Sequence, residues 1–252
     1  MEKSLESLMK MSKKRNYRAL RIKRAIRNGI LYGLALVGFI SIIFYIFSGI
    51  KKVKEKNEQI FIVTTRPEMT VDLLTPNEFS RPQLALEKVN AIVVHYTANP
   101  GTTAAQNRSY FEGLKDTGLT HASSHFIIGL DGEIIQCIPT SEQCYASNDR
   151  NADSVSIECC IPDDTGKFND STYQSCVYLC AWLCGRFNLD PSVDIIRHYD
   201  ITGKDCPKYF VEHPAAWTKF VEDVKTYIKN NGQYENKNYY SSGTSGTDST
   251  GN

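Results

Sequence analysis

Two histidines and one cysteine in this chain have the residue types and the setting of a metal site. A strand-like run over residues 91–94 ends in His95, and further along His198 and Cys206 lie eight positions apart, with Lys204 two positions before the cysteine. Two imidazoles and one thiolate are borderline-soft ligands that suit zinc, with a fourth position left for water. Because zinc lowers the pKa of such a water toward neutrality, the set predicts a hydrolase.

The spacing alone leaves the zinc interpretation and a structural one evenly matched. A single histidine at a strand end is more often structural than a ligand, and only the combination of His95 and His198 with Cys206 favours a metal. Among the remaining histidines, His125 is interpreted as structural, and His121 and His213 as solvated or capping residues. Asp205 adjoins the cysteine and is a weak ligand candidate.

Glu158 is the carboxylate most suited to proton transfer. In the strand-like run 154–161, alternation places Glu158 on the opposite face from Val155 and Ile157. That face is either solvated or part of a cleft, and partial burial in a cleft would raise the pKa of Glu158 and fit it to move protons near neutral pH. Lys204 could stabilise an oxyanion beside the metal, although by itself it would be an ordinary loop lysine.

Strand and helix patterns alternate through the region that must position these side chains, which predicts an α/β or α+β layer architecture. Asp131-Gly132 indicates a hairpin turn, and the polar residues 170–172 indicate a helix start. We expect strands over 91–95, 125–128, 133–136, 155–161 and 194–197, and helices over 104–114, 170–187 and 214–229.

Residues 30–50 carry no charge and are long enough to cross a bilayer as one helix. A buried core helix would show a polar face, and a signal peptide has a shorter apolar region and a small-residue cleavage site. Ten Lys or Arg within residues 1–28 predict a basic cytoplasmic segment over 1–29 and an extracytoplasmic location for the rest. We attribute this basic charge to anionic lipid and expect no nucleic acid partner.

The remaining boundaries follow from composition. We expect an extracytoplasmic stalk over 51–76, a folded domain over 77–230 and a disordered polar tail over 231–252. Of the eight cysteines, Cys137 and Cys144 are close enough in sequence to staple a loop. The three at 176, 180 and 184 line one face of a helix and are interpreted as small core residues. The sequence leaves the redox state open.

The order of motifs across residues 77–230 resembles the type-2 N-acetylmuramoyl-L-alanine amidases, which share a fold with peptidoglycan recognition proteins and phage lysozyme-type amidases. The motifs that carry the resemblance are residues 92–100, 105–107, 124–128, 131–136, 156–158 and 198–207. The resemblance implies a central mixed β-sheet flanked by helices, here preceded by one transmembrane helix. It also implies zinc in a surface groove and hydrolysis of the amide between the muramic acid lactyl group and L-alanine of peptidoglycan.

Carried over by position, the resemblance implies that His95, His198 and Cys206 are the Zn²⁺ ligands. It implies that Glu158 is the catalytic acid or base and that Lys204 stabilises the tetrahedral intermediate. Partners would be the muramoyl stem peptide of peptidoglycan and, through residues 30–50, the lipid bilayer.

The chain departs from the family pattern in two places. Some members have a catalytic tyrosine where this chain has Ser124, and many have a Trp-His-Ala-Gly-like segment where this chain has residues 144–148. The first departure shifts catalysis toward Glu158, and the second puts substrate contacts in that loop in doubt. Two rivals to a membrane-anchored bacterial cell-wall amidase stay open: a non-catalytic peptidoglycan-binding module of the same fold, and a structural anchor within a cell-envelope machine.

Overall fold

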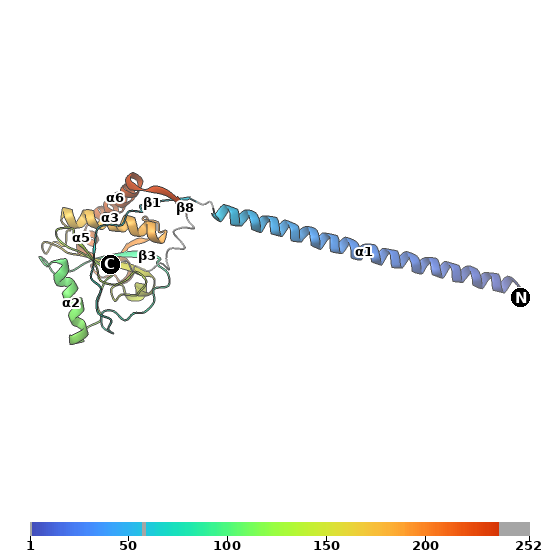
Figure 1. Ribbon diagram of the computed structural model, residues 1–252, viewed down its shortest axis with the longest axis horizontal. Helices are drawn as coiled ribbons and strands as arrows, with labels where there is room; N and C mark the ends of the chain where they lie inside the picture. The colour runs from blue at the N-terminus through green and yellow to red at the C-terminus, as the bar shows by residue number, and fades with distance from the viewer. Residues whose placement is uncertain (1, 57–58, 237–252) are drawn as a thin grey trace. The chain divides into compact units, whose positions relative to one another are not determined.

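The computed structural model describes residues 2–56 and 59–236 of the 252-residue chain (Figure 1). The chain divides into two compact units, residues 1–58 and residues 59–252. The final sixteen residues, which include most of the expected polar tail, lie outside the described part.

The first unit is a single helix, α1 (Glu2–Lys56), and it contains the expected membrane span. Its segment Leu20–Gly49 is long and apolar enough to cross a bilayer, and none of that segment is buried. Large apolar side chains such as Leu34, Phe44 and Tyr45 are exposed around it. Residues 51–56, expected in a stalk, continue the helix.

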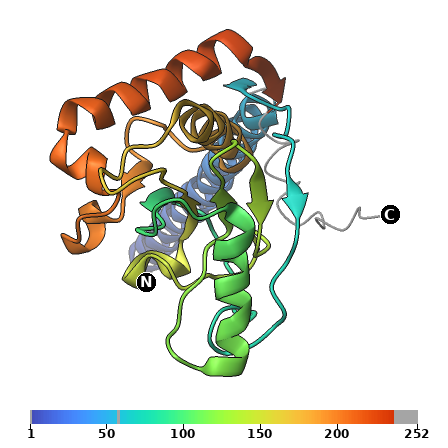
Figure 2. The ribbon, with the colours of Figure 1, turned by 90° about the vertical axis from the view of Figure 1, so that its left-hand side faces the viewer.

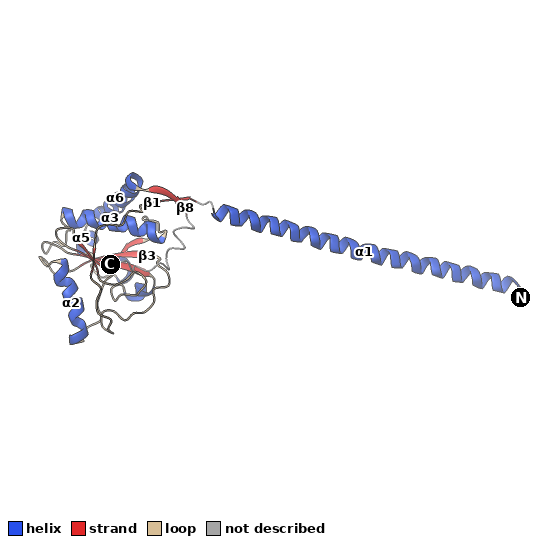
Figure 3. Ribbon diagram, viewed as in Figure 1, coloured by secondary structure: helices blue, strands red, loops and turns tan. Residues whose placement is uncertain are grey.

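The second unit is built on a six-stranded mixed sheet, in the order β2-β5-β4-β6-β3-β7. Its strands lie among helices and loops (Figure 3). Only the β4–β5 pair is antiparallel; all the other neighbours are parallel. The strands are β2 (Thr70–Val71), β3 (Ala91–Tyr96), β4 (Phe126–Ile128), β5 (Ile134–Gln136), β6 (Ser154–Cys159) and β7 (Ile195–Arg197).

Helices cover both faces of this sheet. On one face α3 (Asp170–Phe187) and α6 (Pro214–Asn231) pack against the side chains of Ile92, Val94 and Ile157. On the other face α2 (Ala104–Thr117) covers a second core (Figure 2). Shorter helices complete the unit: η1 (Asn148–Ala152), α4 (Tyr199–Thr202) and α5 (Lys208–Glu212). The fold is therefore an α/β fold with a central mixed sheet flanked by helices, as the resemblance implies.

The folded unit extends further at both ends than the sequence patterns predict. Strand β1 (Gln59–Ile62) pairs antiparallel with β8 (Gln233–Asn236), which joins the expected stalk to the expected tail. Leu74, also expected in the stalk, is fully buried. The sequence understates these segments because each strand is too short to show a clear period and gains its stability only from its partner.

The helix starts match the patterns closely, with one shift in a capping residue. Helix α3 spans the expected 170–187, but its cap is Asn169, whose Oδ1 accepts from the backbone N–H of Thr172 at 2.9 Å. Thr103 caps α2 in a reciprocal box with Gln106. Such caps satisfy amide groups that have no partner within the helix.

All eight cysteines are buried free thiols. The suggested staple between Cys137 and Cys144 is therefore absent from this structure, and both residues pack in the core under α2. Cys176, Cys180 and Cys184 are core residues of α3, as their spacing indicates. Cys159 and Cys160 point into opposite cores, which is the consequence of adjacent positions on a strand.

His125 is structural, as predicted, and ties β4 to its neighbours. Its Nδ1 accepts from the backbone N–H of Ser156 at 3.0 Å and its Nε2 donates to the carbonyl oxygen of Glu142 at 2.8 Å. Burial lowers the pKa of His125 from 6.5 to about 4. Between pH 6.5 and about 4, the His125 ring is therefore neutral in the folded protein, whereas a histidine in the unfolded chain is protonated.

This difference predicts an acid-sensitive fold. As the pH falls from 6.5 to 4, His125 binds a proton in the unfolded chain but not in the folded protein. The free energy of unfolding therefore decreases, by about 3 kcal/mol for this residue. Denaturant titrations followed by tryptophan fluorescence measure it, because both tryptophans, Trp182 and Trp217, lie in this unit. His125→Gln should flatten the pH dependence in that window, and an unchanged slope in the variant would contradict the assignment.

Candidate active site

Three neighbouring parallel strands deliver the site residues to one edge of the sheet. His95 is the penultimate residue of β3, Glu158 is the penultimate residue of β6, and His198 follows β7 directly. His95 and Glu158 are register partners, so their backbones are about 4.8 Å apart and their side chains leave the same face. The carboxyl ends of parallel strands meet at the same edge, which is where open α/β sheets bind ligands.

A compact turn brings Cys206 back to this edge of the sheet. After His198 the chain forms α4, which ends at Gly203 in the left-handed region with φ 77°. The backbone N–H of Tyr199 then donates to the carbonyl oxygen of Cys206 at 2.9 Å, which closes the loop. Glycine suits this helix end because it has no Cβ to oppose a positive φ.

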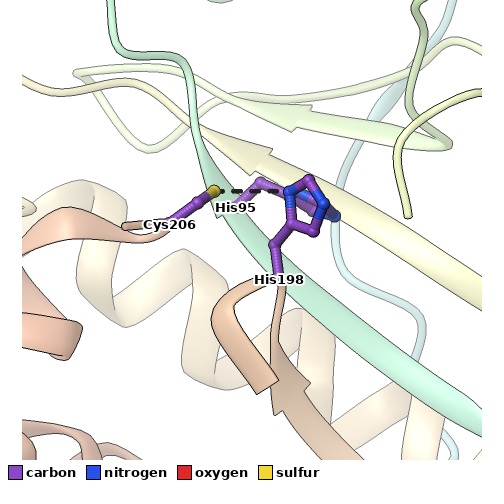
Figure 4. Close-up of side chains that lie close together, drawn as sticks. All are labelled: His95, His198 and Cys206. Atoms are coloured by element: carbon purple, nitrogen blue, oxygen red, sulfur yellow. Dashed lines mark hydrogen bonds between the residues drawn. The ribbon is translucent and has the colours of Figure 1, made fainter. Parts of the chain in front are cut away.

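The three predicted ligands converge (Figure 4). One ligand atom from each of His95, His198 and Cys206 lies within 4.8 Å of the others, and all three residues are buried. Cys206 Sγ and His95 Nδ1 are 3.7 Å apart, and the two imidazole rings have centroids 4.8 Å apart. Two nitrogens and one sulfur at such separations could hold a metal ion, and this donor set is typical of zinc sites that keep an open position.

The outer nitrogen of each imidazole has its own partner in the segment that begins η1. His95 Nε2 lies 3.1 Å from Ser147 Oγ, and His198 Nε2 lies 3.0 Å from Asn148 Oδ1. Ser147 Oγ is also 2.8 Å from Ser156 Oγ on β6. The amide acceptor of Asn148 keeps the proton of His198 on Nε2, which leaves Nδ1 free for a metal.

This supporting segment is itself held firmly. Asn151 Oδ1 accepts from the backbone N–H groups of Ala146 and Ser147, at 3.1 and 2.6 Å. Asn148 has a φ of 51°, a left-handed conformation that asparagine tolerates better than most residues. Ser147 is fully buried. The partners of the two histidines are therefore fixed in position.

Burial keeps the ligand set uncharged. Burial lowers the pKa of His95 well below its ordinary value, and the charges of His198 and Lys204 lower it further. Burial and Lys204 also lower the pKa of His198. Burial raises the pKa of the Cys206 thiol to about 12. Both imidazoles thus offer a lone pair at neutral pH, whereas a metal must displace the thiol proton to bind Cys206.

Glu158 and Lys204 line the same cavity of about 410 Å³ as the three predicted ligands. Burial raises the pKa of Glu158 to about 8, and the charge of Lys204 lowers it in part. Glu158 Oε2 is buried and has no hydrogen-bond partner among the described residues. Glu158 therefore lies in a cleft rather than on a solvated face. Lys204 is exposed at the rim, and Asp205 lies outside the ligand group.

Four residues of the site carry no recognisable signal in the sequence. Ser147 and Asn148 belong to the segment that departs from the Trp-His-Ala-Gly-like pattern, and nothing in their types signalled contact with the histidines. His121, which the sequence predicts to be solvated or capping, lines the cavity with Tyr145, and their rings meet edge to face at 5.2 Å. Ser124 lies outside the cavity lining, and its Oγ donates to the carbonyl oxygen of Phe126 at 2.9 Å.

Comparisons with known proteins agree on one family. A family model described as N-acetylmuramoyl-L-alanine amidase matches residues 85–209, which include all five predicted site residues. The N-acetylmuramoyl-L-alanine amidase BlyA of Bacillus subtilis (strain 168) is 34% identical over 169 residues, covering 59% of this chain and 44% of BlyA. The amidase CwlL of Bacillus licheniformis is 35% identical over 167 residues, covering 61% of this chain and 46% of CwlL.

Solved structures show the same fold. The structure of PlyL superposes with a TM-score of 0.54 at 23% identity, covering 63% of this chain and 97% of PlyL. The catalytic domain of XlyA gives a TM-score of 0.53 at 25% identity, covering 63% and 99%. The chain spans less than half the length of the two curated relatives, so the similarity is one of domains. Through residues 85–209 of its folded unit, the chain matches the N-acetylmuramoyl-L-alanine amidase family.

Proposed function

We propose that this protein is a zinc-dependent N-acetylmuramoyl-L-alanine amidase that hydrolyses the lactyl-L-alanine amide of peptidoglycan. The observation that carries the proposal is the convergence of His95, His198 and Cys206 within 4.8 Å at the sheet edge that also presents Glu158. The family match covers this edge. A binding module of the same fold would not need a complete set of ligands, so the intact set favours the enzyme.

The donor types fit zinc, both imidazoles are neutral, and the outer nitrogen of each imidazole has a supporting partner. His95 Nδ1, His198 Nδ1 and Cys206 Sγ would hold the ion, with Ser147 and Asn148 orienting the imidazoles. When bound, zinc supplies Lewis-acid chemistry: it lowers the pKa of water toward neutrality and polarises the amide carbonyl.

The surrounding side chains perform the proton and charge transfers. Glu158 takes a proton from the attacking water and delivers one to the leaving amine of L-alanine. Its raised pKa, near 8, suits a group that must both accept and donate near neutrality. Lys204, at the rim of the same cavity, provides a cation for the oxyanion that develops on the lactyl carbonyl.

Digestion of purified sacculi tests the proposal. The full-length protein in detergent, loaded with zinc, should release stem peptides with free L-alanine N-termini, which mass spectrometry identifies. Metal analysis should give about one zinc per chain. Binding to sacculi without any release of peptides would instead support the non-catalytic module.

We further propose that α1 anchors the enzyme in the bacterial cell membrane, with residues 1–29 cytoplasmic and the amidase domain outside. The apolar segment Leu20–Gly49 and the basic residues before it support this orientation. Resistance to carbonate extraction, together with protease sensitivity of the domain in intact spheroplasts, checks it. Recovery of the protein in the soluble fraction would rule out the anchor.

The partners of the histidines make a prediction about metal affinity. Ser147→Ala removes the oxygen beside His95 Nε2, and Asn148→Gly removes the acceptor for His198 while keeping the left-handed turn. Each change should weaken zinc binding by about 10-fold or more, since outer partners typically account for 10- to 100-fold in metal affinity. Competition with a chromophoric chelator measures this without any reliance on activity.

Ser175→Ala is the matched control for Ser147→Ala. Ser175 Oγ donates to the carbonyl oxygen of Gly132 at 2.7 Å, away from the site, so its removal deletes a similar hydrogen bond. Zinc affinity in this control should match that of the wild type. If Ser147→Ala also bound zinc as tightly as the wild type, the serine would have no part in orienting His95.

A further inference from the structure

A second hollow adjoins the active-site cavity, and the family model does not include the segment that forms it. The hollow has a volume of about 430 Å³. Seven of its eight lining residues come from the segment 76–84, and the eighth is Tyr145. Tyr145 also lines the active-site cavity, so the two spaces share this residue. Segment 76–84 precedes residues 85–209, the part that the family model matches.

The wall of this outer hollow is preformed. Asn77 and Arg81 form a backbone bridge, with hydrogen bonds of 2.9 and 3.2 Å in the two directions. The guanidinium of Arg81 makes two bonds to Glu142, at 2.8 and 2.7 Å, and a third to the carbonyl oxygen of Leu74 at 2.8 Å. A wall that is already ordered costs a ligand little conformational entropy.

The polar groups of the hollow disfavour an anionic ligand. Arg81 is the one cation in its lining, and Glu142 already pairs with it. Glu78 and Gln83 are exposed, and within residues 59–236 their side chains have no hydrogen bond or ion pair with another residue. A stem peptide with its carboxylates would meet Glu78 without a free cation. A sugar offers hydroxyl and acetamido groups that both side chains can bind.

The ring of Tyr145 adds the apolar element that a sugar needs. Tyr145 packs edge to face against His121, which holds the ring in place between the two spaces. Its apolar body can cover the C–H face of a pyranose while its hydroxyl stays hydrated.

We propose that the outer hollow is a saccharide subsite for an uncharged amino sugar of the glycan strand, next to the muramoyl residue whose amide enters the active-site cavity. This assignment rests on the proposed amidase function for its biological meaning. It gives segment 76–84 the role of selecting polymeric wall over free muramoyl peptides.

Binding of a sugar that the enzyme cannot hydrolyse tests the subsite independently of catalysis. The probe is the β-1,4-linked tetramer of N-acetylglucosamine, titrated calorimetrically into the full-length protein in detergent. The double variant Glu78→Ala/Gln83→Ala should weaken binding about tenfold or more, the expected effect of losing two hydrogen-bonding side chains. Glu87→Ala, which removes an exposed glutamate outside the hollow, should leave the affinity unchanged.

Parallel measurements separate the subsite from the amidase proposal. On sacculi, the double variant should raise KM with little change in kcat, and on a soluble muramoyl peptide it should match the wild type. No binding of the tetramer by the wild type, or equal binding by the double variant, would overturn the subsite even if sacculi are hydrolysed. Loss of stem-peptide binding instead of tetramer binding would assign the hollow to peptide. Tetramer binding without hydrolysis of sacculi would reject the amidase and keep the sugar site.

Discussion

Glu158→Gln should reduce hydrolysis of sacculi by about 100-fold or more while the protein stays folded and zinc-loaded. Glutamine matches the shape of glutamate but cannot carry the proton from water to the leaving amine. The site offers no obvious substitute, because Glu158 is the one carboxylate among the residues that line the active-site cavity. Rates measured on sacculi at saturating zinc, with metal content determined on the same samples, give the comparison.

The same variant carries an internal check on its fold. Burial disfavours the ionised form of Glu158 and raises its pKa from 4.5 to about 8. As the pH rises from 4.5 toward 8, ionisation of Glu158 in the unfolded chain therefore makes the metal-free folded protein less stable. Glutamine removes that penalty, and metal-free Glu158→Gln should be at least as stable as the wild type at pH 8. Glu87→Gln, at an exposed position, serves as the control for charge. An active Glu158→Gln enzyme would remove this residue from the mechanism.

Cys206→Ser should weaken zinc binding by more than about 100-fold, because loss of a direct ligand should cost more than the roughly 10- to 100-fold typical of losing a ligand's hydrogen-bond partner. Hydrolysis should fall in proportion to metal occupancy. A serine hydroxyl is a harder and far less acidic donor than a thiol, and it cannot replace a thiolate at neutral pH. Dialysis against graded chelator concentrations, followed by metal analysis, measures the loss.

Cys160→Ser provides the matched control for this change. Cys160 is buried and its Sγ already accepts a hydrogen bond from Asn107 Nδ2 at 3.5 Å, so a hydroxyl finds a polar neighbour there. Zinc affinity in this variant should equal that of the wild type. Undiminished hydrolysis of sacculi by Cys206→Ser would show that the thiolate is not a ligand in the working enzyme.

The sequence was sufficient to predict elements that have strong local signals. The apolar run of β3, the Asp131-Gly132 turn and the long amphipathic patterns of α3 and α6 are where the alternation of residue types indicates. Resemblance to the family added the mixed sheet and the ligand set, because the order of motifs carries information that no single motif has.

Short elements with distant partners could not be predicted in this way. Strands β1 and β8 are four residues each, and they come from opposite ends of the domain's sequence, although they pair in space. Neither has a period long enough to recognise, and each depends on hydrogen bonds to the other. The composition of these segments therefore suggested a stalk and a tail.

By itself the sequence determined which side chains could bind a metal and move a proton, because residue type decides donor chemistry. Only the tertiary structure decided that they meet: the parallel register of β6, β3 and β7 places Glu158, His95 and His198 at one edge, and the turn after α4 returns Cys206 to them. It also decided that Ser147 and Asn148 support the two imidazoles. Contacts between residues some fifty positions apart depend on strand register and loop closure, and the local pattern of residues does not encode either.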